Sequence, residues 1–312
     1  MPSRTIAITG GLGNQLFQLS AALSSAGGSN VYLDIQLGSP NLNSNSEPEI
    51  LTFVLPNNIF VLPKAKISKI AYLSWKLLLR FSSLGKDANI LVKLLKQLLT
   101  PICSNVFKAS YRRKENIYVA KGINDAPPET KEDLFLVGYF QSTSTTNRMD
   151  FGFLEKLRSP QNHELNEFVK IAKVKNINIL HIRKGDYRNE PKFGVLNENY
   201  FKNCLTISEL TSIDETWLFT DDSIAADNFI NKYSLSNIKR LDKYSFSPSE
   251  TLYLMRHGSN YIISNSSFSW WAARSSTTAN PLVIAPRPWF RGIEVSSNLI
   301  PNNWVIVPAE FD

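Results

Sequence analysis

The sequence predicts an α/β protein with two domains, each built on a parallel β-sheet. Short apolar segments with the length of buried strands alternate with segments of helical periodicity along most of the chain. A length of 312 residues suits two domains of ordinary size. With 43% hydrophobic and 20% charged residues, the composition is that of an ordinary globular protein.

The first segments of the chain are typical of a strand, a glycine turn and a helix. Residues 5–9 are expected to form a buried strand, and Gly10–Gln18 follow directly. This order places backbone N–H groups at a helix start, where they can meet an anion. The turn lacks the third glycine of a dinucleotide fingerprint and the Gly-Lys-Ser/Thr of a P-loop. A purely structural turn is therefore one interpretation, and sugar binding by the amides of Asn14 and Gln15 is the other.

A basic, amphipathic segment dominates the rest of the first half. Between Lys64 and Glu115 there are twelve Lys or Arg residues and two acids, while the whole chain carries a net charge of +7. Apolar residues recur there at helical spacing. Such helices can lie on an anionic membrane surface, or they can pack on the core with a solvated basic face. Nucleic acid is a third possible partner, but the segment has no recognisable nucleic-acid-binding motif.

The compartment is inferred from cysteine usage and from the N-terminus. Cys103 and Cys204 form no metal-like cluster and are too few for a disulfide framework. No signal-peptide hydrophobic region follows the first residues, and we find no uninterrupted apolar run long enough to span a bilayer. We therefore expect a cytoplasmic protein.

The other elements expected in the first half are a strand at residues 31–34, a polar loop at 41–48, helices within 64–99, strands at 117–120 and 134–140, and a helix over 154–174 that leads to the second half.

The centre of the second half is a buried strand at residues 177–182. It leads directly into Arg183, Lys184, Gly185 and Asp186. Ligands of open α/β sheets bind at the carboxyl ends of strands. The planar fork of Arg183 and the mobile charge of Lys184 could together neutralise a diphosphate, although a strand ending in solvated charges is the alternative.

Two later segments carry further polar groups. A strand at residues 216–220 ends in Asp221 and Asp222, which could accept hydrogen bonds from a base or ribose, or cap a helix that begins near Ser223. Adjacent carboxylates without a third ligand are weak evidence for a metal site. A strand at 261–263 leads into a Ser/Asn turn that could form a second anion cradle. The remaining expected elements are helices at 199–205 and from 248, and strands at 283–285 and 304–307.

Three motifs together resemble the bacterial α-1,2-fucosyltransferases of glycosyltransferase family 11. They are Gly10–Gln18 (Gly-Gly-Leu-Gly-Asn-Gln-Leu-Phe-Gln), His181–Tyr187 and Asn265–Trp271 (Asn-Ser-Ser-Phe-Ser-Trp-Trp). They occur in the family's order and span most of the chain. The family pattern in the second motif is His-x-Arg-Arg-Gly-Asp-Tyr, so Lys184 replaces an arginine; this keeps the charge and loses the bidentate fork.

The resemblance implies a GT-B-like fold, with two Rossmann-like domains facing a central cleft. Residues 1–155, with a basic helical insert at about 64–115, would form the acceptor-side domain. Residues 156–312 would bind the donor, and their last segment could pack back on the first domain. The implied reaction is an inverting transfer of L-fucose from GDP-β-L-fucose to O2 of a terminal galactose, with no metal ion or other cofactor.

The resemblance also implies a biological setting. The acceptor would be a β-galactoside oligosaccharide, free or lipid-linked, in O-antigen or surface polysaccharide synthesis. The basic insert would suit peripheral contact with the inner membrane, and no nucleic-acid partner is expected. Two alternatives are a transferase with another GDP-sugar donor, such as GDP-mannose, and a non-catalytic module that binds nucleotide or glycan.

By the same resemblance, Arg183 would contact the β-phosphate, Asp221 or Asp222 the guanine, and Asn14 the fucose or the acceptor. We expect Asp186 to fix either Arg183 or the turn by hydrogen bonding, with Glu190 as a candidate base and Asp186 as a second candidate. The full donor-binding set is His181, Arg183, Lys184, Asp186, Tyr187, Asp221, Asp222, Asn265, Ser266, Ser267 and Phe268, and the cleft loop contributes Gly11, Gly13, Asn14 and Gln15.

Overall fold

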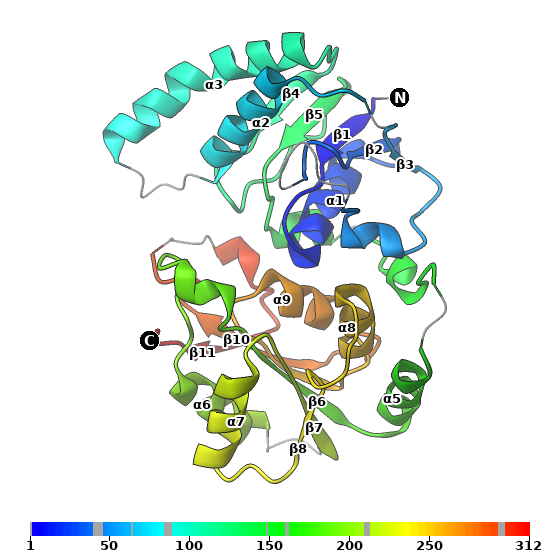
Figure 1. Cartoon of the computed structure of the whole chain (residues 1–312), viewed down its shortest axis with the longest axis vertical. Coiled ribbons are helices and arrows are strands. Elements are labelled where there is room, and N and C mark those ends of the chain that lie inside the picture. Colours follow the sequence, from blue (N-terminus) through cyan, green and yellow to red (C-terminus); the bar gives the residue numbers. More distant parts are fainter. Residues whose placement is uncertain are drawn as a thin grey trace. The chain divides into compact units, whose positions relative to one another are not determined.

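The chain folds into two compact α/β units (Figure 1). The computed structural model describes residues 2–39, 46–63, 65–83, 89–147, 149–159, 162–208, 213–292 and 297–312. Unit 1 comprises Met1–Lys156 and Ser296–Leu299, and unit 2 comprises Leu157–Val295 and Ile300–Asp312. Each unit contains one sheet in which all strand pairs are parallel, so the predicted fold class is confirmed.

Unit 1 contains a five-stranded sheet in the order β3-β2-β1-β5-β4. Its strands are β1 (Arg4–Ala7), β2 (Val31–Asp34), β3 (Ile59–Val61), β4 (Asn116–Val119) and β5 (Leu134–Val137). Parallel strands that are covered on both faces read as continuous apolar runs, and β5 is fully buried along its length. The edge strand β3 was not predicted, because it is three residues long and exposes Phe60 and Val61.

The helices of unit 1 cover this sheet. They are α1 (Leu12–Ala26), α2 (Lys69–Ser82), α3 (Ile90–Ser110) and the short α4 (Thr143–Thr146), with 3₁₀ helices at Glu49–Thr52 and Gly152–Glu155. Trp75 and Leu78 of α2 and Phe107 of α3 pack in one cluster with Phe135 and Val137 of β5. The predicted basic insert therefore consists mainly of α2 and α3.

Helix α3 is longer than the sequence predicts. It continues through Pro101 to Ser110, about ten residues beyond the expected end. It is long and apolar enough to cross a membrane, by length and composition only. Lys93 and Lys96 interrupt its apolar residues, so the helix qualifies by its mean composition and not as an uninterrupted apolar run.

Unit 2 contains a six-stranded sheet in the order β11-β10-β9-β6-β7-β8. Its strands are β6 (Ile177–Ile182), β7 (Glu215–Thr220), β8 (Ile238–Arg240), β9 (Asn260–Ile262), β10 (Leu282–Arg287) and β11 (Val305–Pro308). The strand predicted at 177–182 is confirmed with its bounds, and all its residues are buried. Edge strand β8, three residues long, was not predicted.

Helices α5 (His163–Val174), α6 (Glu198–Ser208), α7 (Ser223–Lys232), α8 (Pro248–Met255) and α9 (Ser267–Arg274) complete unit 2. The single helix predicted over 154–174 was wrong. A 3₁₀ helix ends at Glu155, and α5 begins only at His163, where the Asn162 side chain accepts a hydrogen bond from the backbone N–H of Leu165 at 2.6 Å.

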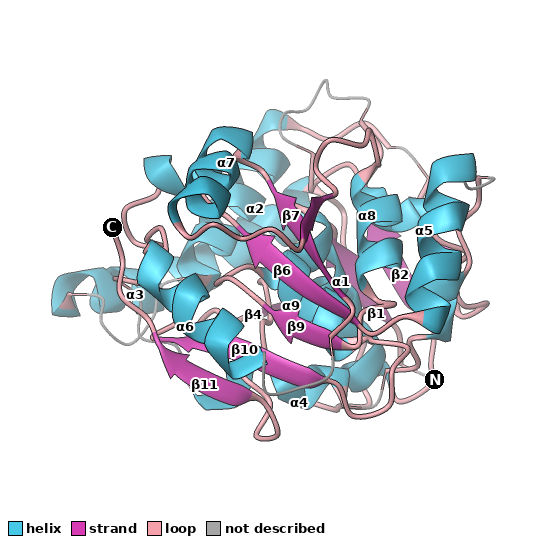
Figure 2. Cartoon of the chain, turned by 90° about the horizontal axis from the view of Figure 1, so that it is seen from below, coloured by secondary structure: helices cyan, strands magenta, loops and turns pink. Residues whose placement is uncertain are grey.

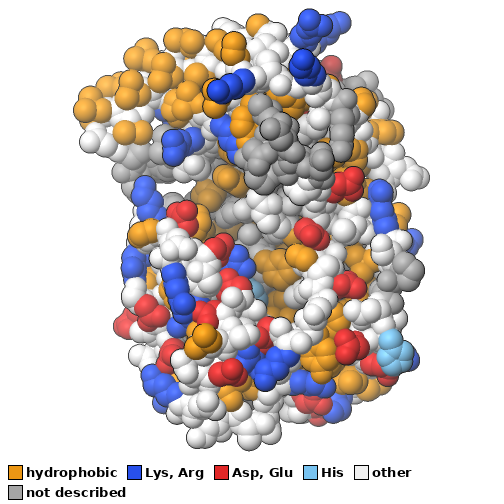
Figure 3. Space-filling model, viewed as in Figure 1, with side chains coloured by type: hydrophobic (Ala, Val, Ile, Leu, Met, Phe, Trp, Pro, Cys, Tyr) orange, Lys and Arg blue, Asp and Glu red, His pale blue; other side chains and the backbone are white. Residues whose placement is uncertain are grey.

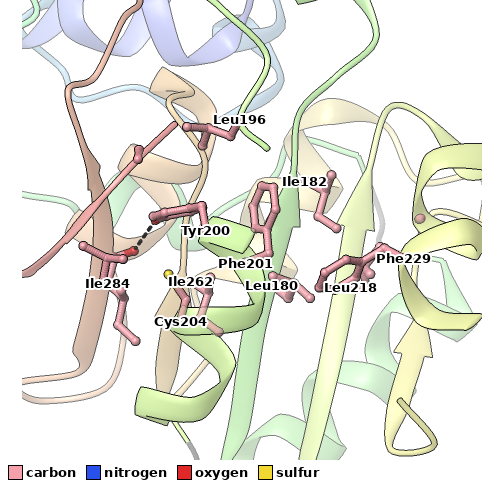
Figure 4. Packing of buried hydrophobic residues seen from close by; sticks show 13 residues of the cluster. Leu180, Ile182, Leu196, Tyr200, Phe201, Cys204, Leu218, Phe229, Ile262 and Ile284 are labelled. Atoms are coloured by element: carbon pink, nitrogen blue, oxygen red, sulfur yellow. Dashed lines mark hydrogen bonds between the residues drawn. The ribbon is translucent and has the colours of Figure 1, made fainter. Parts of the chain in front are cut away.

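Alternation along β6 directs its side chains to two faces of the sheet. Leu180 and Ile182 join a cluster with Phe201 of α6 and Phe229 of α7 (Figure 4). Tyr200 anchors α6 to the strands, because its hydroxyl donates to the carbonyl of Ile263 at 2.7 Å and lies 3.4 Å from that of Ile284. His181 lies on the opposite face of β6, and Trp270 and Trp271 of α9 are fully buried core residues.

Candidate active site

Three neighbouring strands of unit 2 end in polar segments at one edge of the sheet. β6 pairs with β7 on one side and with β9 on the other, all in parallel (Figure 2). Arg183 and Lys184 follow β6, Asp221 and Asp222 follow β7, and the 264–267 turn follows β9. The carboxyl edge of an open parallel sheet is its usual ligand-binding edge. The structure therefore brings together the polar segments that the sequence singled out in the second half.

Two carboxylates hold the guanidinium of Arg183. Its Nε and Nη2 donate to Oδ1 and Oδ2 of Asp186 at 3.0 and 2.9 Å, and its Nε lies 3.1 Å from Oδ2 of Asp221. Burial alone would lower the pKa of Arg183, but the charges of Asp221 and Asp186 outweigh burial and the pKa is raised. Among the described residues, Nη1 has no hydrogen-bond or ion-pair partner. The braced side chain thus keeps one edge for an anion.

Asp221 also fixes the backbone that follows β6. Its Oδ1 accepts a hydrogen bond from the backbone N–H of Lys184 at 2.9 Å. A Cβ atom on Gly185 would lie 2.7 Å from Oδ2 of Asp221, so a larger residue would displace the carboxylate. Asp221 is therefore engaged in holding the loop that carries Arg183.

Asp222 is the N-cap residue of α7. Its Oδ1 caps α7 by accepting a hydrogen bond from the backbone N–H of Ala225 at 2.9 Å, and its other oxygen pairs with Arg188. Of the two interpretations left open by the sequence, the capping interpretation is confirmed for Asp222. Guanine binding by either carboxylate stays a prediction.

His181 is buried beside these groups and is neutral. Its Nδ1 lies 2.9 Å from Oγ of Ser264, and its ring centroid lies 6.1 Å from that of Phe268. Burial lowers the pKa of His181 to about 3, and the positive charge of Arg183 acts in the same direction. A neutral imidazole can serve the site by hydrogen bonding but adds no positive charge at neutral pH.

The turn before α9 is tied to the loop after β6. Ser266 is the N-cap residue of α9 and accepts a hydrogen bond from the backbone N–H of Phe268 at 3.3 Å. The hydroxyl of Tyr187 donates to the carbonyl of Asn265 at 3.0 Å, and burial raises the pKa of Tyr187. The Asn265 amide donates to two carbonyls of the 193–194 turn, both at 3.1 Å. The start of α9, including Ser267, is thereby held at this edge of the sheet.

A pocket of about 300 Å³ opens beside the loop after β6. Its lining residues are Lys184, Tyr187, Arg188, Pro191, Gly194, Val195, Arg291 and Asp312. Three of these are cations, and the Nζ of Lys184 lies 3.4 Å from Oδ2 of Asp312. An anionic ligand would therefore find positive charge here, although Asp312 already neutralises part of it.

Arg188 and Arg291 were missed by sequence reasoning. Arg188 lies one residue beyond the His181–Tyr187 motif, so proximity to the motif was the available signal. Arg291 lies four residues after the end of β10 and reaches the pocket only through the fold, where its backbone N–H donates to the carbonyl of Phe193 at 3.2 Å.

The two candidate bases have different surroundings. Asp186 commits both oxygens to Arg183, which is one of the two hydrogen-bonding roles expected of it. Glu190 follows the 3₁₀ helix Asp186–Asn189 and is exposed. Across the residues described, no group of three or more His, Cys, Asp or Glu side chains is placed to hold a metal ion.

In unit 1, the glycine turn between β1 and α1 has its own network. Gly10 has a φ of 77°, a conformation that favours glycine, and a Cβ atom there would lie 2.9 Å from Nδ2 of Asn14. Oδ1 of Asn14 accepts a hydrogen bond from the Gln141 side chain at 2.9 Å. Gly11 is the N-cap residue of α1, and Gly13 is buried in its first turn.

Gln15 is buried and serves the fold. Its Nε2 donates to the carbonyl of Gly10 at 2.8 Å, and its Oε1 accepts from the backbone N–H of Ile50 at 2.9 Å. Both ends of the amide therefore shape the turn, which supports the structural interpretation for Gln15 but leaves a sugar contact by Asn14 open.

Residues 104–301 match the family model described as Glycosyl transferase family 11. The matched region is more than half of the chain and contains the polar segments that follow β6, β7 and β9. The chain belongs to glycosyl transferase family 11. The resemblance carried by the three sequence motifs is confirmed at the level of the family. The Gly10–Gln18 motif lies outside the matched region.

Two relatives from Escherichia coli extend the comparison. The family 11 chain is 30% identical over 216 residues to "O-antigen biosynthesis glycosyltransferase WbnK". The aligned region covers 64% of this chain and 68% of that protein. It is 27% identical over 315 residues to an "Alpha-1,2-colitosyltransferase", which covers 96% of each chain. The second alignment includes the N-terminal unit that the family model leaves largely unmatched.

Two solved structures can be aligned with most of the family 11 chain. The fucosyltransferase NodZ from Bradyrhizobium is 13% identical, with 88% of this chain and 94% of NodZ covered and a TM-score of 0.45. POFUT1 in complex with GDP-fucose is 10% identical, with 91% and 97% covered and a TM-score of 0.47. Both TM-scores are below 0.5, so neither likeness bears on the function of the family 11 chain.

Proposed function

We propose that this glycosyltransferase moves L-fucose from GDP-β-L-fucose to O2 of a terminal galactose, with inversion and without a metal ion. The observation that carries the proposal is membership of family 11, with an α-1,2-colitosyltransferase related along 96% of the chain. The name of the WbnK relative places that protein in O-antigen biosynthesis. We propose the same class of pathway here, in the bacterial cytoplasm.

The leaving diphosphate is the group that needs the most stabilisation. As the bond between the anomeric carbon and the β-phosphate oxygen breaks, negative charge grows on GDP. The Nη1 edge of Arg183, the ammonium of Lys184 and the N-terminus of α9 at Ser266 and Ser267 are the groups we assign to that charge. Asp186 and Asp221 hold Arg183 in place before the charge appears.

The remaining roles follow from the surroundings of each residue. The acceptor O2 attacks the anomeric carbon opposite the leaving group and gives its proton to a base, for which Glu190 is our candidate because Asp186 is committed to Arg183. We assign guanine contacts to Asp221 or Asp222 and sugar contacts to Asn14.

Colitose is a second candidate for the transferred sugar, because one full-length relative is named a colitosyltransferase. Fucose and colitose differ by a single hydroxyl group, at C3. A site built to hydrogen-bond that hydroxyl rejects the sugar that lacks it by up to about 10⁴–10⁵-fold, whereas a site that merely tolerates it discriminates far less. The two donors must therefore be compared directly.

The deciding experiment is a transfer assay with GDP-fucose and GDP-colitose, each with a panel of β-galactosides and with EDTA present. NMR of the product reads the sugar, the anomeric configuration and the linkage. An α-1,2-fucosyl product in EDTA supports the proposal. Transfer of colitose alone would replace the donor, and loss of turnover in EDTA that Mg²⁺ restores would refute metal independence.

Failure to transfer either sugar has two separable meanings. Tight GDP binding without turnover on any β-galactoside would point to a different donor sugar or acceptor, or to a non-catalytic nucleotide-binding module. Absence of GDP binding would contradict the assignment of Arg183 and Lys184 to a diphosphate.

A further inference from the structure

We propose that α2 and α3 of unit 1 form a docking surface for an anionic lipid bilayer, with α3 lying in the plane of the interface. Among the described residues, 18 large hydrophobic side chains are exposed, and 11 of them belong to these two helices. They are Ile70, Leu73 and Leu77 of α2, and Ile90, Leu91, Val92, Leu94, Leu95, Leu98, Ile102 and Val106 of α3. Figure 3 shows hydrophobic side chains gathered along α3.

Helix α3 has two apolar faces, although packing on the core requires only one. The inward face carries Leu99, Cys103 and the fully buried Phe107, which packs at 5.1 Å between ring centroids on Phe135. The outward face repeats at helical spacing of three or four residues through Leu91, Leu95, Leu98, Ile102 and Val106. Only Phe107 is buried in the whole helix. An exposed stripe of this length indicates an interaction surface.

The charges on the two helices favour an anionic partner. α2 and α3 contain six Lys or Arg residues and no Asp or Glu. On α2, Lys69, Lys76 and Arg80 lie within one helical turn of the exposed Leu73 and Leu77. Apolar side chains flanked by cations are typical of helices that insert into the headgroup region of anionic membranes. Two copies of this surface would instead bring like charges together.

The fold decides between lying on a membrane and crossing it. α3 is long and apolar enough to span a bilayer. However, β1 precedes α2 and α3 in the chain, β5 follows them, and the two strands pair directly in one sheet. A single crossing by α3 would put these paired strands on opposite sides of the membrane. With the sheet intact, α3 can contact the bilayer only from one side.

Cosedimentation of the full chain with vesicles tests this proposal without any substrate. Vesicles of phosphatidylcholine alone are compared with vesicles that also contain phosphatidylglycerol, at low and high salt. The test variant is Leu91→Gln with Leu98→Gln, whose side chains are 65% and 66% exposed. The matched control is Val174→Gln with Ile224→Gln, which are 82% and 76% exposed on α5 and α7 of unit 2.

We expect wild type and control to bind anionic vesicles at low salt, and to bind much more weakly at high salt or without phosphatidylglycerol. Full insertion of one leucine into the bilayer raises the membrane affinity roughly tenfold. The test variant should therefore bind about 100-fold more weakly. Charge reversal at Lys69 and Lys93 should weaken binding to anionic vesicles in the same way.

Three results would overturn the proposal. The first is wild type remaining in the supernatant with anionic vesicles at low salt. The second is equal binding by the leucine variant and the control. The third is a concentration-dependent dimer in light scattering that the leucine variant abolishes while no form of the protein binds vesicles, which would assign the stripe to a second copy of the chain.

Discussion

Arg183 shows how neighbours decide the role of a cationic side chain. Asp186 occupies one edge of the guanidinium with two hydrogen bonds, and Asp221 approaches the same Nε while also holding the backbone of Lys184. The arginine is therefore oriented before any ligand arrives. Preorganisation of this kind is what makes a charged group effective on a developing negative charge.

Replacing Arg183 should slow the proposed transfer far more than it weakens folding. Arg183→Ala should lower kcat by about 10²–10³-fold, because one preorganised donor to the leaving diphosphate is lost. Arg183→Lys should recover only part of the rate, since it keeps the charge without the fork that Asp186 holds. Steady-state kinetics of the fucosyl transfer provide the measurement.

Lys232→Ala serves as the control, because it removes an exposed ammonium of unit 2 that pairs with Glu198 and lies 5.4 Å from the ring centroid of Tyr233. If Arg183→Ala and Lys232→Ala had the same kcat, Arg183 would have no part in the chemical step.

Acid should destabilise the protein through His181. The unfolded chain protonates this imidazole near its ordinary pKa of 6.5, whereas the folded protein does so only near 3, because of burial and then of Arg183. The unfolded state therefore gains the proton first as the pH falls. The stabilisation is complete above pH 6.5 and is lost below it, at about 1.4 kcal/mol per pH unit.

Urea unfolding at pH 7.5 and pH 5.0 measures this loss. Wild type should lose about 2 kcal/mol more than His181→Gln over that interval, because the amide keeps a hydrogen-bonding group for Ser264 but does not titrate. Parallel pH dependence of the two proteins would contradict the buried, neutral histidine.

At the scale of single residues, the sequence predicted which side chains lie at the site more reliably than it predicted their contacts. The motif around His181 identified Arg183 and Asp186, but it left open whether Asp186 bonds to Arg183 or to the turn, and the structure shows the bonds to Arg183. Arg291 could not be found in this way, since it reaches the pocket from a segment more than 100 residues later in the chain. Its position depends on the path of the chain after β10.

Gly38 shows how tightly two elements of unit 1 approach each other. It lies in the turn that follows β2, and a Cβ atom there would lie 1.5 Å from the carbonyl oxygen of Ile8, just beyond β1. Gly38→Ala should therefore destabilise the protein by about 3 kcal/mol or more, because the clash is with backbone and no side-chain rotation relieves it. Urea unfolding provides the measurement.

Gly122→Ala is the matched control, as a Cβ atom at Gly122 meets no atom within 4 Å. It should change stability by less than about 1 kcal/mol. Equal effects of the two substitutions would show that the turn after β2 can move away from β1.

At the scale of elements, the shortest edge strands were the ones that could not be predicted. β5 is a continuous apolar run, and β6 is fully buried and apolar except for Asn178 and His181; both were expected from the sequence. β3 and β8 are three-residue edge strands with partly exposed side chains, so neither has a periodic signal. The end of α3 was missed because Pro101 signals a break, while packing through Phe107 in its last turns keeps the helix continuous.

At the scale of the whole molecule, donor binding should be visible as stability. A ligand that binds only the folded state adds about 2.7 kcal/mol at 100 times its Kd. GDP should therefore raise the melting temperature of wild type, and Arg183→Ala should need a higher GDP concentration for the same shift. Differential scanning fluorimetry with UDP as the comparison nucleotide tests whether the protein distinguishes guanine from uracil. Equal shifts with GDP and UDP would contradict guanine recognition.

The two-unit organisation and the carboxyl edge of the second sheet could be predicted, because strand and helix patterns alternate throughout the chain. The sequence did not predict that the outward face of α3 is exposed. Leu91 and Leu98 belong to a helical pattern that fits either the core or a membrane surface, and only the packed structure shows that Phe107 and its neighbours already supply the contact with the core.

The strand order of the second sheet has a consequence for synthesis on the ribosome. β6 has β7 on one side and β9 on the other, but β9 is made about 80 residues after β6. At roughly 5–20 residues per second, the emerging chain spends about 4–16 s with one side of β6 lacking its permanent neighbour. A chain that stalls before residue 260 presents that open edge to other nascent chains, so slow translation of this interval favours aggregation.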